Sequence, residues 1–124
     1  MDSIAPNIFV EDIQKTIEFY KLLGFTIVAS VPEQGDLIWV MLVCGKVTFM
    51  FQTFQSLGEE LPEVSRQNGG SLLLYIQIKE IRKFFESIKD QVKILKGLET
   101  TFYGATEFSI KDPNGYVLTF AEDE

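Results

Sequence analysis

The sequence contains 18 Asp and Glu residues but no histidine, the side chain most often used as a general base. Without histidine the chain can form neither a Ser-His-Asp triad nor a Cys-His pair. Glu107 is a candidate general base, but the sequence offers no second catalytic group to act with it. A phosphate-binding Gly-Lys-Ser motif and a glycine-rich dinucleotide fingerprint are also missing. We therefore assign no catalytic residue from the sequence.

An internal repeat indicates which elements must position any site. Residues 10–21 resemble residues 78–89, with Ile13 matching Ile81 at an offset of 68 positions. Repetition of this kind predicts one fold built from two copies of a supersecondary unit.

The first copy is expected to fold as a strand, a helix and three further strands. Asp12 has the side chain of a helix N-cap, and Gly24 can end the helix. The β-branched and apolar residues that follow are typical of strands. The expected strands span residues 3–10, 26–31, 37–43 and 47–52.

The second copy is expected to repeat this order. Ile81, Phe84, Phe85 and Ile88 follow the i, i+3, i+4, i+7 spacing of one helix face. The Asp-Pro-Asn-Gly segment at 112–115 has the residue types of a tight turn. The expected strands span residues 71–78, 92–95, 106–111 and 116–121.

Together the two copies predict an α+β fold of two βαβββ modules within a single domain, residues 1–124. The modules cover about 1–52 and 71–124, and a linker spans residues 53–70. This linker is long for a plain connection, so it is expected to hold a helical turn or to act as a hinge.

Composition and charge exclude several classes of partner. The net charge of −7 argues against nucleic acid, because phosphate binding needs a basic surface. The apolar runs are too short to span a bilayer, and we expect no signal peptide, because no charged segment followed by an apolar one opens the sequence. The single cysteine, Cys44, excludes an internal disulfide. We expect a cytoplasmic protein that binds neither nucleic acid nor membranes.

Two motifs occur in order along the chain. The first is Val10-Glu11-Asp12, Ile17-Glu18-Phe19-Tyr20 and Leu23-Gly24-Phe25, and the second is Phe108-Ser109-Ile110-Lys111-Asp112-Pro113-Asn114-Gly115. In this order they resemble the vicinal oxygen chelate superfamily, which includes glyoxalase, bleomycin-resistance proteins and extradiol dioxygenases. The resemblance covers nearly the whole chain, and it implies a cupped mixed sheet with helices on its outer face and a site in the cup.

The metal positions of the family are altered in this sequence. In the family's metalloenzymes four inward side chains hold one divalent ion, and the matching residues here lack suitable donor atoms. Alanine and leucine offer none, a thioether is soft, and a lone threonine hydroxyl is weak. We therefore expect no metal and no other cofactor. The matching residues are Ala5, Met50 (or Phe49 after a one-residue slip), Leu73 and Thr119.

The inward side of the family's strands also names candidate ligand-binding residues. They combine apolar and aromatic surface with a few polar groups, as small-molecule sites commonly do. Trp39 and Tyr75 also suit a structural role in the core, and the amides can bind each other or water. The candidates are Asn7, Trp39, Met50, Gln52, Tyr75, Gln77, Tyr103, Glu107 and Thr119.

In character the sequence is most similar to the metal-free bleomycin-resistance branch. This similarity implies a homodimer that confers antibiotic resistance by sequestering an apolar or aromatic ligand, and the acidic net charge fits a cationic one. One alternative is a glyoxalase- or dioxygenase-type enzyme whose metal is held by Glu107, Gln52 or Gln77. Another is a dimeric scaffold that binds no ligand.

Overall fold

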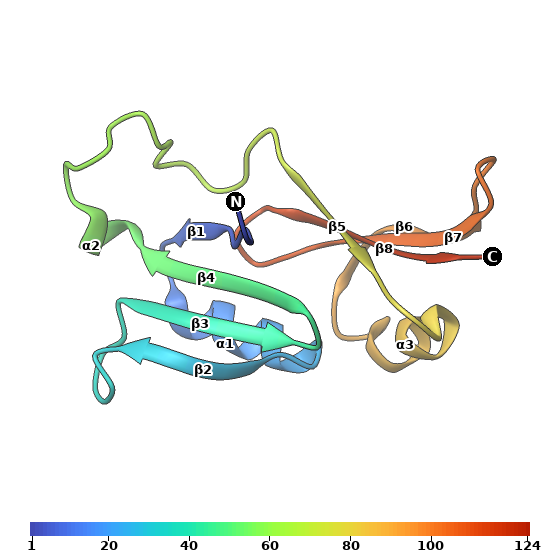
Figure 1. The fold of residues 1–124 in the computed structure, drawn as a ribbon, viewed down its shortest axis with the longest axis horizontal. Coiled ribbons are helices and arrows are strands. Elements are labelled where there is room, and N and C mark those ends of the chain that lie inside the picture. The colour runs from blue at the N-terminus through green and yellow to red at the C-terminus, as the bar shows by residue number, and fades with distance from the viewer. The chain divides into compact units, whose positions relative to one another are not determined.

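A computed structural model describes residues 1–124, which divide into two compact units (Figure 1). Unit 1 comprises Met1–Asn68, and unit 2 comprises Gly69–Glu124. Each unit contains a four-stranded mixed sheet and one helix of two or more turns. This arrangement confirms the predicted α+β fold of two βαβββ modules. None of the helices is long and apolar enough to cross a membrane.

The sheet of unit 1 has the order β1-β4-β3-β2. β1 runs parallel to β4, and the other neighbours are antiparallel. The helix α1 (Ile13–Leu22) begins where predicted, because Oδ1 of Asp12 accepts a hydrogen bond from the Lys15 backbone N–H at 3.0 Å. The strands are β1 (Asn7–Val10), β2 (Thr26–Val31), β3 (Trp39–Cys44) and β4 (Val47–Thr53).

An aromatic core joins α1 to one face of this sheet. Tyr20 of α1 is fully buried, and its ring centroid lies 4.8 Å from that of Phe51 and 5.7 Å from that of Phe49. Phe49 and Phe51 alternate with Met50 along β4, so the aromatic side chains face the helix. The Met50 side of the strand faces away from α1.

Unit 2 repeats this plan with the sheet order β5-β8-β7-β6. The helix α3 (Ile81–Ile88) packs against β7 and β8. Phe84 and Phe85 have ring centroids 6.1 and 5.0 Å from that of Phe108, which confirms the predicted apolar face of the helix. The strands are β5 (Leu73–Gln77), β6 (Lys93–Thr100), β7 (Ala105–Lys111) and β8 (Val117–Asp123).

The largest differences in strand length from the sequence prediction are those of β1 and β6. β1 begins at Asn7 rather than at residue 3, because the preceding Pro6 has no N–H to donate, although its carbonyl accepts from the Met50 N–H at 2.9 Å. β6 continues to Thr100 instead of ending at residue 95. Its register with β7 shifts twice, so its side chains do not alternate regularly and the sequence pattern ends early.

The connection after β4 contains the predicted helical turn, α2 (Phe54–Leu57). The Thr53 hydroxyl caps it by accepting from the Ser56 N–H at 3.1 Å. The loop that follows closes around Arg66, whose guanidinium donates hydrogen bonds to backbone carbonyls. The carbonyls belong to Gly58, Glu60, Leu61 and Val64.

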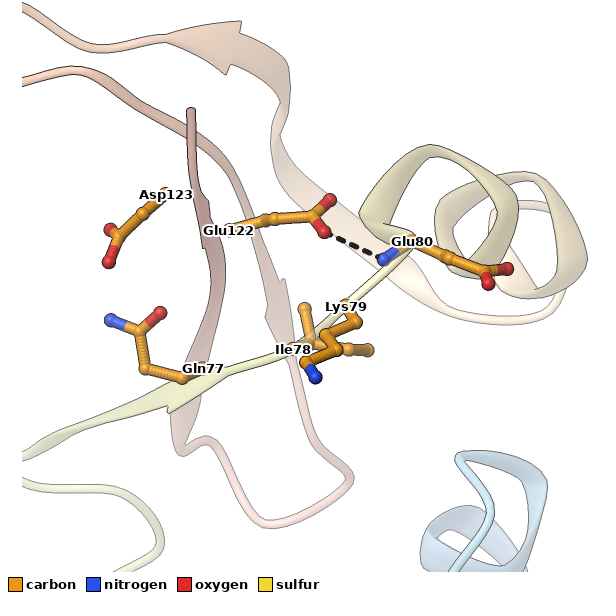
Figure 2. Close-up of a pocket in the computed structure, with 6 residues that line it drawn as sticks. All are labelled: Gln77, Ile78, Lys79, Glu80, Glu122 and Asp123. Carbon is orange, nitrogen blue, oxygen red and sulfur yellow. Dashed lines mark hydrogen bonds between the residues drawn. The ribbon is translucent and has the colours of Figure 1, made fainter.

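The helix α3 is capped by a side chain from a distant strand. The carboxylate of Glu122 on β8 accepts from the backbone N–H of Glu80 at 2.9 Å (Figure 2). It also accepts from the backbone N–H of Ile81 at 3.0 Å. Glu80 has a left-handed backbone with φ of 56°, and its own side chain makes no capping hydrogen bond. These hydrogen bonds, led by that from Ile81, lower the pKa of Glu122.

Replacing Glu122 by Gln is therefore expected to change how stability depends on pH. Because the folded-state pKa lies below its ordinary value of 4.5, the stabilisation is present above pH 4.5 and is lost as the pH falls through the lowered value. Wild type should be more stable than Glu122→Gln near neutral pH, and the two should converge in acid. Urea unfolding between pH 3 and 7 checks this expectation, and a difference that is the same at every pH would contradict it.

Candidate functional site

In unit 1 the predicted site residues lie on the sheet face opposite α1. Asn7 is directly opposite Met50 in the register, and Trp39 is directly opposite Gln52. Side chains at directly opposite positions project to the same side of a sheet, so all four share one face. None of the four is fully buried, in contrast to Phe51 on the other face.

The polar residues of this face form a chain of hydrogen bonds. Nδ2 of Asn7 donates to Oε1 of Gln52 at 3.0 Å, and Nε2 of Gln52 donates to Oγ of Ser56 at 3.1 Å. Ser56 in turn donates to the Thr53 carbonyl at 2.9 Å. Oδ1 of Asn7 is buried and accepts no hydrogen bond within the chain, which is uncommon for a buried polar atom.

In unit 2 the predicted residues also lie on the face opposite the helix. Tyr75 and Ser109 are directly opposite Thr119 in the register, and Glu107 is directly opposite Ala121. Ser109 and Thr119 hydroxyls are 2.8 Å apart and form a buried hydrogen bond. A patch of hydroxyl and carboxylate groups therefore covers the middle of this face.

Two tyrosines converge on one carboxylate of this patch. The Tyr75 hydroxyl donates to Oε2 of Glu107, and the Tyr103 hydroxyl donates to the same oxygen at 2.5 Å. Tyr103 reaches it from the loop between β6 and β7. Hydrogen bonding to Glu107 is the main cause that raises the pKa of both phenols, because the carboxylate favours their protonated form.

Replacing Glu107 by Gln should lower the pKa of Tyr75 and Tyr103 toward 10, their ordinary value. In wild type their raised pKa favours the folded state below pH 10, and this contribution is lost as the pH rises through the folded-state values. Ultraviolet titration of tyrosinate checks this, with Tyr75→Phe and Tyr103→Phe assigning the transitions. Identical titrations of wild type and Glu107→Gln would show that the two tyrosines do not donate hydrogen bonds to Glu107.

A cavity of about 280 Å³ lies over this tyrosine–glutamate cluster. Lys96 and Glu99 of β6 also line it and form an ion pair, with Nζ and Oε1 separated by 3.4 Å. The sequence prediction did not include these two residues, because the irregular register of β6 hides which side chains face the site. The sequence prediction also missed Ser109, although it projects to the same side of β7 as Glu107.

Gln77 is separate from this cavity. It lines a larger hollow of about 610 Å³ together with Lys79, Glu80, Glu122 and Asp123 (Figure 2). Glu122 there is engaged with the start of α3, and Figure 2 places the Gln77 amide on the side of Asp123. Of the predicted residues in unit 2, the structure therefore brings together Tyr75, Tyr103, Glu107 and Thr119, but not Gln77.

The two modules present different chemistry at matching positions. Asn7 is opposite Met50 in the parallel strand pair of the first module, and Tyr75 is opposite Thr119 in the parallel strand pair of the second. Asn7 and Tyr75 therefore occupy matching positions. By the same reasoning Trp39 matches Glu107. The first module thus offers amide and apolar groups, whereas the second offers phenols, hydroxyls and a carboxylate.

The comparisons with known proteins place the chain in a family. Residues 1–120 match the Glyoxalase/Bleomycin resistance protein/Dioxygenase superfamily, so this protein belongs to that superfamily. No curated protein is significantly similar to it in sequence.

Solved structures with this fold include proteins of different kinds. The chain is similar to TioX from Micromonospora, with a TM-score of 0.79 and 16% identity over 100% of both chains. It is similar to a protein of unknown function from Agrobacterium tumefaciens, with a TM-score of 0.79 and 27% identity over 100% of this chain and 95% of the other. A bleomycin-binding protein complexed with bleomycin has a TM-score of 0.68 and 23% identity over 100% of both chains.

The residues at the family's metal positions do not fit a divalent ion. Leu73 offers only an aliphatic side chain, and the Thr119 hydroxyl is hydrogen-bonded to Ser109. In unit 1 the matching side chains of Ala5 and Met50 supply a methyl group and a thioether. No group of three or more Cys, Asp or Glu residues is placed to hold a metal ion.

Proposed function

We propose that this protein binds an apolar or aromatic small molecule on the helix-free faces of its sheets, without using a metal. The observation that carries the proposal is the cavity over Tyr75, Tyr103 and Glu107, where aromatic surface surrounds a few oriented polar groups. This combination is typical of small-molecule sites. Thr119, at a family metal position, lines the same cavity with its hydroxyl hydrogen-bonded to Ser109.

The helix-free face of unit 1 supports the same function. Trp39 and Met50 add apolar surface there, beside the hydrogen-bonded amides of Asn7 and Gln52. The bleomycin complex of one structural neighbour, and the lack of donor atoms at the family's metal positions, support sequestration rather than turnover. A homodimer is part of this proposal, because a two-fold pair needs only self-complementary surfaces.

Titration of the purified protein with bleomycin and a panel of neutral and cationic aromatic compounds tests the proposal. Trp39 is the single tryptophan, so its fluorescence reports binding near unit 1, and calorimetry detects binding at any place. We expect saturable binding of at least one compound, with the fluorescence change absent in Trp39→Phe. A flat response in both measurements across the panel would overturn the proposal.

A further inference from the structure

We propose that Glu107 is an anchor for a protonated amine or amidinium group of the ligand, with Tyr75 and Tyr103 as the residues that position it. The inference rests on the proposed ligand-binding function, and it adds a chemical class of ligand and the residue that recognises it.

The hydrogen bonds of Glu107 leave half of its carboxylate available. Both phenols donate to Oε2, whereas Oε1 accepts no hydrogen bond from any residue of the chain. A carboxylate oxygen has two lone-pair sites, so Oε1 can accept from N–H donors of a ligand. Charge-assisted hydrogen bonds of this kind are shorter and stronger than neutral ones.

The negative charge of Glu107 is also uncompensated. Its two partners are neutral phenols, and it takes part in none of the four ion pairs. Lys96, the one cationic residue that lines the cavity, is already paired with Glu99. The cavity therefore keeps one unbalanced negative charge, which favours a cationic group over a neutral or anionic one.

An organic cation suits this arrangement better than a metal ion. Both neighbouring hydroxyls direct their protons at Glu107, and a hard cation needs several oxygen ligands that present lone pairs. The rings of Tyr75 and Tyr103 instead supply the aromatic surface that stabilises an ammonium or amidinium group. A cavity of about 280 Å³ suits the cationic end of a ligand rather than a complete large molecule.

The two phenols restrict the orientation of the carboxylate before the ligand arrives. Holding a recognition group in its bound geometry reduces the ordering cost of binding. Tyr75 comes from the centre of β5, and Tyr103 comes from a loop, so the two restrain Glu107 from different elements. Both tyrosines are about half exposed, at 48% and 57%, which leaves the cluster open to a ligand.

Benzamidine and its uncharged analogue benzamide test the inference at neutral pH. The two share one shape, so calorimetry or tyrosine-ring NMR shifts measure the contribution of the charge. We expect wild type to bind benzamidine about 10-fold more tightly than benzamide. This ratio corresponds to the lower end of the free energy that a hydrogen bond to a charged group contributes. Glu107→Gln should abolish this preference, and Tyr75→Phe or Tyr103→Phe should reduce it.

A matched variant separates local recognition from net charge. Glu18→Gln removes the same charge from an exposed position on α1, and it should leave the preference unchanged. Equal affinity of wild type for the two compounds, or an equal loss in Glu18→Gln and Glu107→Gln, would overturn the inference. Failure of benzamidine to bind while a neutral aromatic compound binds would also overturn it and would leave the proposed function intact. If none of the compounds binds, both the inference about Glu107 and the proposed ligand-binding function are overturned.

Discussion

Replacing Phe108 by Ala is expected to lower the free energy of unfolding by about 3–5 kcal/mol, the usual cost of truncating a buried phenylalanine. Its side chain is 1% exposed, and its ring stacks on that of Phe120 with centroids 5.1 Å apart. The rings of Phe84 and Phe85 complete the contact with α3. Alanine would leave a cavity at the centre of this cluster, directly beneath the site-bearing face of β7.

Urea unfolding followed by circular dichroism measures this effect. Phe108→Leu keeps most of the volume and should cost much less. Phe102→Ala is the matched control, because that phenylalanine is fully exposed and its loss should change stability by less than about 0.5 kcal/mol. Similar losses in Phe108→Ala and Phe102→Ala would show that the aromatic cluster does not carry the stability of unit 2.

Asp112→Ala is expected to destabilise the protein by about 3 kcal/mol, because two hydrogen bonds to a buried charged group would be lost. Asp112 is 4% exposed, and its Oδ1 accepts from the backbone N–H groups of Asn114 and Tyr116 at 2.9 and 2.8 Å. These bonds fix the turn between β7 and β8. The register that brings Ser109 beside Thr119 depends on this turn.

Asp112→Asn is the control for this prediction. Its amide oxygen can still accept the two backbone hydrogen bonds, so we expect a loss clearly smaller than that of Asp112→Ala. Thermal unfolding and urea unfolding should rank the variants in that order. Equal stability of wild type and Asp112→Ala would mean that the turn is specified by Pro113 and Gly115 without the aspartate.

Much of the fold could be predicted because local signals agreed with the tertiary structure. The cap at Asp12 and the apolar stripe of α3 are encoded within a few residues, and both are confirmed. The capping of α3 by Glu122 could not be predicted, because that side chain comes from a strand 41 positions away from Ile81. The full length of β6 was missed because its register shifts conceal the alternation of side chains.

Strand parity also explains what could be predicted of the candidate site. Alternation along β4 and β5, combined with the inward side that the family resemblance implies, predicted that Met50 and Tyr75 face the site, and both lie on the helix-free faces. The alternation of side chains along a strand cannot specify which residues of one face contact each other. The convergence of Tyr75 and Tyr103 on one oxygen of Glu107 depends on a loop conformation, and it emerges only in three dimensions.

The internal repeat gives a physical reason to expect binding without a metal. Matching positions have the same backbone register in both modules, although their side chains differ. Neither module keeps donor atoms suited to a divalent ion at these positions, as Met50 and Leu73 illustrate. What remains are aromatic, amide and hydroxyl groups together with Glu107, a set suited to recognising an organic molecule.

The metal content of untagged protein, purified without chelators, tests the proposed metal-free function most directly. A histidine tag must be avoided because it would add the imidazole ligands that this sequence lacks. We predict far less than one transition-metal or alkaline-earth ion per chain by elemental analysis, with binding of the aromatic panel unaffected by EDTA. One tightly held ion per chain, together with loss of binding after its removal, would contradict the account.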